Sequence, residues 1–576
     1  MPHPRRPAGA KAPRCSLVPA LALGATIWTI PALAEASPGV ANRLSGAHAQ
    51  GPATASVTGI YHNPAMLGAL PGLNFQTTLR TGVDHLSVRR FAIDSDGAPT
   101  DSLGERIDLA NPAFDYFIGA SFLLDPIAIG AAVHTFDGRY RYASDSALSY
   151  HLAPEDDIGC TFDSSRICPQ VRQGGALELR TDFDLSLAWN ALDFMSVGAT
   201  LHFPRQRTYL ARDIDSALTS SDEGCDASVD GVENPDCAER LSFRGSTKLR
   251  WFGLRDSPSS RLDFALTVGV AFAIRDRLTV GIRYRTQPLL EGGTITLNGE
   301  AVVCSDDTED DSLPTCESAS AIAATLTETL PRELAVGIAG GIGNWQLDAN
   351  LYWIDRCPGS EKGGGCDDRD GRQLELVGLD QSASTLSETT IYRGLRDVYG
   401  AELWARYRLD DLVGANLPYY KVLCSGPTID PTTGKRMRCV PRVDLLLGAG
   451  FNSPAVDPDS LTAASSDGWT VLASIGTSFN LPGRSGTWSL VPAYGLDLSL
   501  PTRVGPGGRT PAYDPTDAVA FEASGGDINH ASAEAVLAGR AQPTNAALYV
   551  GAVHTIIFSV RWSERGIGAR ELPARR

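Results

Sequence analysis

Large apolar residues alternate with small or polar residues along many segments of this chain. From Phe264 to Ile274 every second residue is large and apolar, and the residues between are Ala, Thr or Gly. The segments that begin at Trp345 and at Val443 repeat this pattern. A period of two residues places alternate side chains on opposite faces of a β-strand. The pattern therefore predicts strands with one apolar face and one face of small or polar residues.

Fourteen segments carry this alternation, and their length suits strands that cross a membrane. A soluble β-sandwich would show the same alternation, but apolar-out segments of about ten residues are typical of a transmembrane barrel. Trp189, Trp345, Trp353 and Trp562 lie near segment ends, as an interfacial aromatic belt requires. We therefore predict an all-β fold, a 14-stranded antiparallel transmembrane β-barrel. The segments are 72–90, 113–124, 127–143, 176–190, 194–210, 261–274, 278–297, 331–342, 345–356, 396–408, 441–453, 468–481, 487–500 and 547–562.

Short and long connections alternate between these segments, which is the pattern of periplasmic turns and outer loops. Tight turns are expected at Asp125-Pro126, Leu192-Asp193 and Gly343-Asn344. Residues 410–440 break the rule, and are either a periplasmic insertion or the sign of a miscounted strand. Residues 239–252 are either loop or an extra strand. The expected long connections are 91–112, 144–175, 211–260, 298–330, 357–395, 454–467 and 501–546.

The N-terminal region has the features of a secretory signal peptide. A basic stretch that ends at Arg14 precedes the apolar residues 17–30, and Ala32-Leu33-Ala34 supplies the small residues of a cleavage site. We predict a signal peptide over residues 1–34. No later stretch approaches the 18 apolar residues of a membrane helix. The net charge of −17 argues against nucleic-acid binding, which needs a basic surface.

The ten cysteines after residue 34 fall into five neighbouring couples within polar connections. Long apolar segments separate the couples, so we expect each cysteine to pair with its neighbour in an oxidising compartment. No couple has the C-x₂-C spacing of a zinc site or a histidine pair nearby. We therefore expect no metal and no cofactor. The expected disulfides are Cys160 with Cys168, Cys225 with Cys237, Cys304 with Cys316, Cys357 with Cys366, and Cys424 with Cys439.

Enzyme signatures are absent from the sequence. It contains no G-x-S-x-G, no H-E-x-x-H and no phosphate-binding P-loop. His134, His202 and His554 are single residues within predicted strands, where we expect them to face the lumen or an interface. The chain is therefore not expected to be an enzyme.

Three stretches of the sequence are similar to motifs of one protein family. The residues Ile60-Tyr61-His62-Asn63-Pro64-Ala65 resemble the Ile-Tyr-Tyr-Asn-Pro-Ala stretch that precedes the first barrel strand in the FadL/TodX family of outer-membrane transport proteins. Residues 329–353, with Leu330-Pro331 and Trp345-Gln346-Leu347, look like the family's entry into a strand pair. Residues 447–456 look like its strand that ends in Ser-Pro-Val. The three matches occur in the family's order and span most of the mature chain.

This resemblance implies a plug inside the lumen and an opening in the barrel wall. The plug would be residues 35–71, with Asn63, Pro64 and Ala65 as its motif. The barrel would be residues 72–562, and residues 563–576 form a basic tail where the family normally stops. A kink in the third strand opens the wall sideways in the family, and Gly130 and Gly138 are the candidates here. Ser56-Val57-Thr58 and Met66 depart from the family's pattern.

The resemblance also implies a function, namely passive uptake of long-chain fatty acids or other hydrophobic small molecules across the bacterial outer membrane. The protein would be a monomer surrounded by outer-membrane lipid and lipopolysaccharide. Arg283, Arg285, Arg406 and Arg408 face the lumen by alternation. They would either bind a substrate carboxylate or pair with lumen acids. Two rival functions remain. A general diffusion porin would have the same barrel without a plug, and a surface adhesin or structural barrel would use the large outer loops.

Overall fold

The computed structural model describes most of the predicted barrel and part of the predicted plug. The predicted signal peptide, residues 35–50 and residues 565–576 lie outside the described part. The described residues are 51–93, 99–136, 138–141, 149–150, 171–172, 176–215, 238–247, 264–274, 278–289, 293–305, 321–356, 374–378, 388–391, 395–409, 428–429, 436–437, 442–456, 461, 468–482, 486–505 and 547–564.

The five expected disulfides also fall outside the described residues. Only the backbone of Cys304 is described, in a strand, and its side chain is not. The pairing of neighbouring cysteines therefore stays a prediction. The other nine cysteines of the expected couples lie outside the described residues: Cys160, Cys168, Cys225, Cys237, Cys316, Cys357, Cys366, Cys424 and Cys439.

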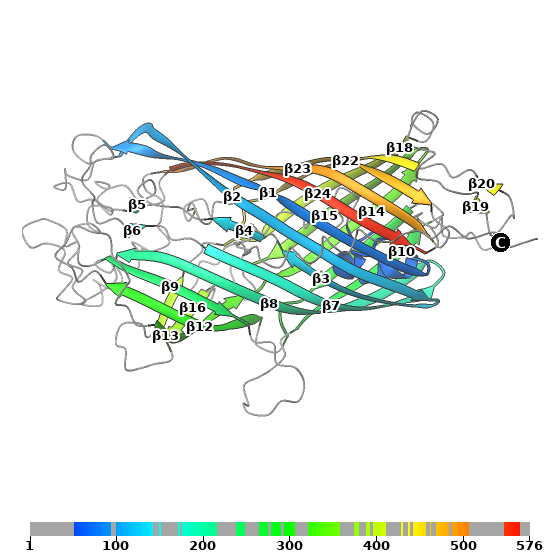
Figure 1. Ribbon diagram of the computed structural model, residues 1–576, viewed down its shortest axis with the longest axis horizontal. Coiled ribbons are helices and arrows are strands. Elements are labelled where there is room, and N and C mark those ends of the chain that lie inside the picture. Colours follow the sequence, from blue (N-terminus) through cyan, green and yellow to red (C-terminus); the bar gives the residue numbers. More distant parts are fainter. Residues whose placement is uncertain are drawn as a thin grey trace, which may run out of the picture. The chain divides into compact units, whose positions relative to one another are not determined.

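Fourteen antiparallel strands close into a barrel, because each pairs with the next along the chain and the last pairs with the first. Each of the fourteen predicted segments contains one of these strands, but the segment 278–297 is wrong beyond Arg285, because residues 294–297 belong to a further strand (Figure 1). They are β1 (Leu73–Ile93), β2 (Pro99–Leu124), β3 (Ile127–Phe136) with its continuation β4 (Gly138–Arg141), β7 (Ala176–Leu192), β8 (Met195–Asp215), β10 (Ala265–Ile274), β11 (Leu278–Arg285), β14 (Arg332–Ile342), β15 (Trp345–Asp355), β18 (Val398–Arg408), β21 (Arg442–Asn452), β22 (Thr470–Pro482), β23 (Thr487–Val504) and β24 (Ala547–Ser563).

The outer surface of the barrel carries exposed large apolar side chains on many of its strands. On β7, Leu185, Leu187 and Trp189 are 56%, 56% and 52% exposed, and the residues between them are small or polar. Ile338 and Ile556, on strands of other parts of the wall, are exposed in the same way. A closed barrel with such an exterior is the signature of an outer-membrane protein. Among the described residues, none belongs to a helix long and apolar enough to cross a membrane.

Five further strands, which we call the extension, continue one side of the wall towards the end of the barrel opposite the short turns. They add to β8 in the order β9 (Ala238–Ser246), β12 (Thr294–Ser305), β13 (Ala321–Thr329), β16 (Leu374–Gly378) and β17 (Glu388–Ile391). The extra-strand interpretation is therefore confirmed for residues 239–246, and residues 248–252 lie outside the described residues. The expectation that 298–330 and 357–395 are loops is wrong for residues 298–305, 321–329, 374–378 and 388–391, which lie in these strands. The expectation for 91–112 is also wrong, because β1 and β2 stay paired as far as Ile93 and Pro99.

Apart from β9 and the first residues of β12, these strands were not predicted because their outer face is not apolar, as is expected of strands beyond the hydrocarbon layer. Arg244 and Glu300 are exposed on the outer face of the extension. Pro204 lies where β8 changes partner from β10 to β9, while Pro288 and Pro331 lie in the links from β11 to β12 and from β13 to β14. Proline has no N–H to donate, so a ladder is readily interrupted at these positions.

The two strand ends that are joined by residues 410–440 lie at the end of the barrel that carries the short turns. β18 and β21 pair directly, and the backbone N–H of Arg408 donates to the carbonyl of Asn344 in the short turn between β14 and β15. The miscounted-strand alternative is therefore excluded. Within this connection β19 (Thr428–Ile429) pairs with β20 (Arg436–Met437). A further small pair, β5 (Ser149–Tyr150) and β6 (Val171–Arg172), lies towards the opposite end (Figure 1).

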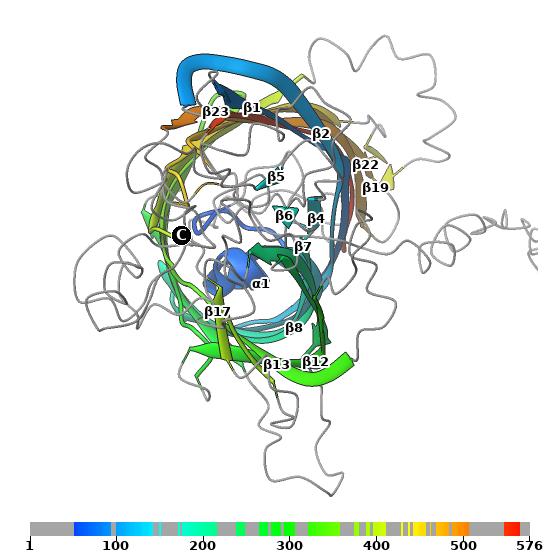
Figure 2. The ribbon, with the colours of Figure 1, turned by 90° about the vertical axis from the view of Figure 1, so that its left-hand side faces the viewer.

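Two short helices lie inside the ring of strands. They are α1 (Gly59–His62) and the 3₁₀ helix η2 (Pro64–Ala69). Seen along the barrel, α1 is enclosed by the wall (Figure 2). We call residues 51–71, which include both helices, the inner segment. Lumen-facing side chains of the surrounding strands are mostly polar, for example Gln76, Asp184 and Asp348, which are almost fully buried.

Candidate functional site in the barrel lumen

Asn63 is the centre of the contacts between the inner segment and the wall. Its side chain is fully buried. The Nδ2 group donates to the carbonyl of Pro52 at 2.6 Å and to that of Val270 on β10 at 3.1 Å. The Oδ1 atom accepts from the backbone N–H of Ala65 at 3.1 Å. One amide therefore joins the start of the segment, its helix η2 and the barrel wall.

The local sequence explains the turn at this position. The backbone of Asn63 is extended, with φ −170° and ψ 104°, and its side chain caps η2. Asparagine is among the best N-cap residues, and proline at the first helical position is preorganised for the helix. Asn63-Pro64-Ala65 is thus a short capped turn that ends α1 and begins η2.

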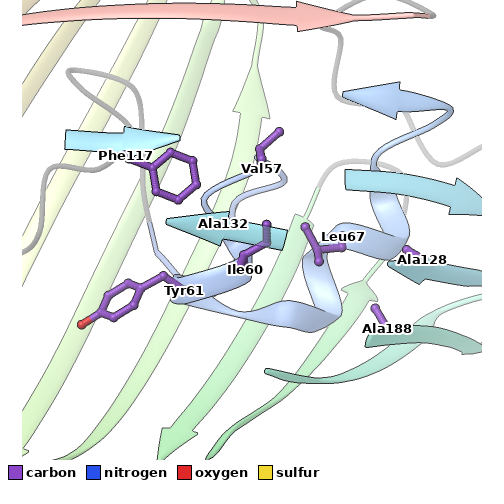
Figure 3. Close-up of a cluster of buried hydrophobic side chains, with 8 residues drawn as sticks. All are labelled: Val57, Ile60, Tyr61, Leu67, Phe117, Ala128, Ala132 and Ala188. Atoms are coloured by element: carbon purple, nitrogen blue, oxygen red, sulfur yellow. The ribbon is translucent and has the colours of Figure 1, made fainter. Parts of the chain in front are cut away.

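The apolar side of the inner segment packs against β2, β3 and β7. Val57, Ile60 and Leu67 lie in one buried cluster with side chains of these strands (Figure 3). Two hydrogen bonds add to this packing: Thr200 Oγ1 donates to the carbonyl of Ile60 at 2.7 Å, and Asn190 Nδ2 donates to that of Gly68 at 3.1 Å. The wall residues of the cluster are Phe117, Ala128, Ala132 and Ala188.

Glycines let the inner segment approach the wall closely. A Cβ atom at Gly269 on β10 would overlap the side-chain oxygen of Asn63. At Gly281 on β11 it would overlap the carbonyl of Pro52. The missing side chains at these inward positions therefore provide the space for the contacts made by Asn63 and Pro52.

Tyr61 is held by two arginines and a glutamate. In Figure 3 its ring extends from α1 with the hydroxyl end pointing away from the apolar cluster. The guanidinium carbons of Arg283 and Arg285 lie 5.1 and 5.2 Å from the ring centroid, within cation–π distance. Arg283 also donates to the Tyr61 carbonyl at 3.3 Å and forms a 2.6 Å ion pair with Glu333. The Tyr61 hydroxyl donates to Glu333 at 3.3 Å.

Below Tyr61 a buried cluster joins β3, β7 and β8. Arg285 and Arg180 pair with Asp182 at 2.7 and 3.0 Å. Asp184 accepts hydrogen bonds from His134 Nε2 at 2.8 Å and from His202 Nδ1 at 2.7 Å. One ring nitrogen of each of these two histidines and one carboxylate oxygen of each of the two aspartates all lie within 4.8 Å of one another, so this group could hold a metal ion.

His62, the last residue of α1, is buried next to these groups. Its burial, and secondarily the positive charge of Arg283, hold the pKa of His62 well below its ordinary value. The imidazole is therefore neutral at neutral pH.

The outer part of the lumen is apolar, unlike its middle. On β1 the inward residue Asp84 is followed by Leu86 and Val88, which are buried with side chains of β23 and β24. On the opposite side Leu297 and Leu326 lie on the face of the extension that continues the lumen face of β8, because directly paired residues share a face. The apolar cluster of the extension comprises Phe243, Ile295, Leu297, Ala301, Ala324, Leu326 and Leu330.

The two glycine candidates for a kink in the third strand differ in position. Gly130 lies in an unbroken ladder on both sides, and a Cβ there would crowd Ile60 of the inner segment. Gly138 follows a one-residue shift in register, because Phe117 pairs with His134 whereas Phe114 pairs with Gly138. The same shift occurs towards β7, so the third strand contains a bulge next to Gly138.

The four arginines that were expected to face the lumen are distributed over three places. Arg283 and Arg285 are buried beneath the inner segment, as described above. Arg406 approaches Asp444 at 3.7 Å on another side of the lumen, and Arg408 is exposed at the end that carries the short turns. The sequence did not indicate Glu333 or Asp182 as the acids that pair with Arg283 and Arg285. Alternation places these acids on the lumen side, but their pairing depends on long-range register.

The fold of this chain has counterparts among solved structures. No protein-family model matches the chain, and no curated protein sequence matches it. A FadL homologue from Pseudomonas aeruginosa is 11% identical, with 92% of this chain and 99% of that chain covered and a TM-score of 0.55. The toluene transporter TodX of Pseudomonas putida is 13% identical, with 91% and 98% covered and a TM-score of 0.50.

Identities this low establish the fold alone. The closed barrel and its apolar exterior make the chain a multi-pass protein of the bacterial outer membrane. It shares the 14-stranded antiparallel β-barrel fold of FadL and TodX.

Proposed function

We propose that this protein is a channel for passive uptake of hydrophobic small molecules. The observation that carries the proposal is the apolar inner face at the outer end of the barrel. A water-filled pore for sugars would have a polar mouth, whereas Leu86, Val88, Leu297 and Leu326 lie there in buried apolar clusters on the inner face. Each CH₂ group removed from water contributes about 0.8 kcal/mol, so a long alkyl chain or an aromatic ring would be captured readily.

We propose that residues 35–71 are a plug that blocks the straight path to the periplasm. The buried contacts of Asn63, Pro64 and Ala65 support this role. The same contacts argue against a general diffusion porin. Solute would leave sideways through the wall at the bulge next to Gly138, where the register of the third strand shifts by one residue against both β2 and β7.

The substrate class extends to uncharged molecules. Arg283 and Arg285 already form ion pairs with Glu333 and Asp182, so a substrate carboxylate would have to displace an acid from each. TodX, which has the same fold, is a toluene transporter. Fatty acids and aromatic hydrocarbons are therefore both candidates, and the arginines are more readily explained as anchors of the inner segment.

Uptake measurements test the function. Cells with and without this gene are given labelled toluene, a labelled long-chain fatty acid and a small labelled sugar. Loss of toluene or fatty-acid uptake with unchanged sugar entry supports the channel. A fall in sugar entry alone makes the protein a porin.

Two variants test the parts of the mechanism. Leu297→Asn on the inner face should weaken capture by about 10- to 100-fold, the value of burying one leucine, whereas Thr296→Asn on the outer face should not. Deletion of residue 137 removes the extra residue and should lower hydrophobic uptake while the barrel still assembles. Equal effects of the two Asn variants, or normal uptake after the deletion, would contradict the apolar mouth and the lateral route respectively.

A further inference from the structure

The cluster of His134, Asp184 and His202 is not explained by uptake of hydrophobic molecules. Its residues lie on three neighbouring strands, β3, β7 and β8, and all are buried. The register brings them together, because His202 pairs directly with Asp184 and His134 pairs with Asp182, two residues earlier on the same strand. Alternation then turns all of these side chains to the lumen.

The carboxylate of Asp184 differs from the neighbouring carboxylates in its partners. Asp182 is paired with Arg180 and Arg285, and Glu333 with Arg283. Within the described part of the chain, by contrast, neither arginine nor lysine forms an ion pair with Asp184, whose hydrogen bonds come from two imidazoles. A buried carboxylate normally has a paired cation or a bound metal ion.

We propose that His134, Asp184 and His202 bind a divalent transition-metal ion, of which Zn²⁺ is the natural probe. Two imidazole nitrogens and a carboxylate oxygen are ligands that such ions prefer. His202 Nδ1 and His134 Nε2 lie 2.7 and 2.8 Å from the carboxylate oxygens of Asp184. These distances are shorter than the roughly 3.3 Å between ligand atoms of a tetrahedral zinc with bonds of about 2.0 Å. The donors therefore need to separate by about half an ångström. Asp182 belongs to the same group and would serve as a fourth ligand once one of its oxygens is released from Arg180 or Arg285.

The surroundings of His202 suit this role. Its other ring nitrogen, Nε2, is 2.7 Å from the hydroxyl of Thr267 on β10. In the metal-bound state Nε2–H donates to this hydroxyl and Nδ1 faces the ion, which is the usual arrangement around a metal-bound histidine. The hydroxyl can also donate, so it accommodates the opposite tautomer when the site is empty.

Metal binding would tie β3, β7 and β8 together directly beneath the inner segment. The Tyr61 ring lies edge-on to His134 at 5.2 Å and to His202 at 6.2 Å between ring centroids. Tyr61 thus covers the cluster and should slow exchange of the ion.

Cobalt titration of the full-length folded protein tests the site. The protein is purified in detergent, stripped with a chelator and treated with iodoacetamide to block any free thiols. We expect about one Co²⁺ per chain with the intense visible absorption of four-coordinate cobalt, which Zn²⁺ abolishes by competition. Absence of this absorption, or binding only at millimolar Co²⁺, would overturn the proposal without bearing on uptake.

Variants locate the ion. His202→Gln and Asp184→Asn should abolish the signal, and Thr267→Val should weaken binding by about 10- to 100-fold. His554→Gln is the matched control, because His554 is exposed and contacts Tyr494 far along the chain from the cluster. Tyr61→Ala should speed removal of the metal by a chelator. The same signal in wild type and in folded His202→Gln protein would also overturn the proposal, and the cobalt titration of the wild type decides the question if a variant fails to fold.

Discussion

Replacement of Asn63 is the most direct test of how the inner segment is held. Asn63→Ala removes three hydrogen bonds and leaves the carbonyls of Pro52 and Val270 and the N–H of Ala65 without this partner. At about 1 kcal/mol for each bond the loss is roughly 3 kcal/mol. Because 1.4 kcal/mol is a factor of ten, the segment should detach about 100-fold more often.

Hydrogen exchange measures this detachment without any assumption about transport. The backbone N–H groups of Ile60, Tyr61 and His62 donate to carbonyls within the inner segment. Their exchange should accelerate by about 100-fold in Asn63→Ala, since exchange follows the equilibrium of local opening. Asn63→Asp should act similarly, because the carboxylate still accepts from Ala65 but faces two carbonyl oxygens without a proton to donate.

A graded control comes from Asn190, whose side chain makes one bond of 3.1 Å to the inner segment. Asn190→Ala should accelerate the same amides by only about 5-fold, the value of about 1 kcal/mol. Exchange in the barrel strands serves as the internal reference. Unchanged exchange of Ile60, Tyr61 and His62 in Asn63→Ala, or equal effects of Asn63→Ala and Asn190→Ala, would refute the central role of Asn63.

Three further predictions concern the same segment. Gly281→Ala should displace it and accelerate exchange at least 10-fold, whereas Gly341→Ala, where a Cβ would meet only the Trp345 carbonyl at 3.8 Å, should leave it unchanged. Arg283→Gln should reduce uptake of a fatty acid and of toluene to the same extent; a loss confined to the fatty acid would instead identify Arg283 as a carboxylate site. The pKa of buried His62 is lowered below its ordinary value near 6.5, so the protein binds fewer protons when the inner segment is packed against the wall than when it is detached. The stability of the packed state should therefore fall as the pH drops below about 6.5 towards that lowered pKa. His62→Gln should remove this part of the pH dependence of exchange, and an unchanged profile would assign it to other groups.

The barrel strands can be predicted from the sequence because they face the membrane. A strand such as residues 264–274 must present apolar side chains to lipid, so its alternation survives whatever lies in the lumen. The extension lacks this constraint. In β12 and β13 the apolar residues face inward, as Leu297 and Leu326 do, and the outer face is polar. The rule that found the barrel therefore assigned these strands to loops.

The lumen contacts show a different limit of sequence analysis. The resemblance located the capped turn at Asn63, but its partner Val270 is 207 residues away in sequence. Likewise, alternation predicted that His134 and His202 face the lumen or an interface. Their hydrogen bonds to Asp184, however, depend on the register of two strand pairs. A shift of two residues in either ladder would preserve the facing of every side chain and separate the cluster. Such contacts follow from register, which the pattern of a single strand does not contain.

The chemistry of the inner segment bears on the route that a solute takes. Asn63, Tyr61 and their partners are held by amide hydrogen bonds and ion pairs, among them Arg283 with Glu333. A neutral hydrocarbon can neither donate nor accept a hydrogen bond, so it gains nothing by replacing any of these contacts. Pushing the segment aside would then cost its full anchoring free energy, of which Asn63 alone accounts for roughly 3 kcal/mol. The register of the third strand already shifts next to Gly138, where we propose that an apolar solute passes into the lipid. For this class of substrate we therefore expect the sideways path to be the easier one, with the inner segment remaining in place throughout transport.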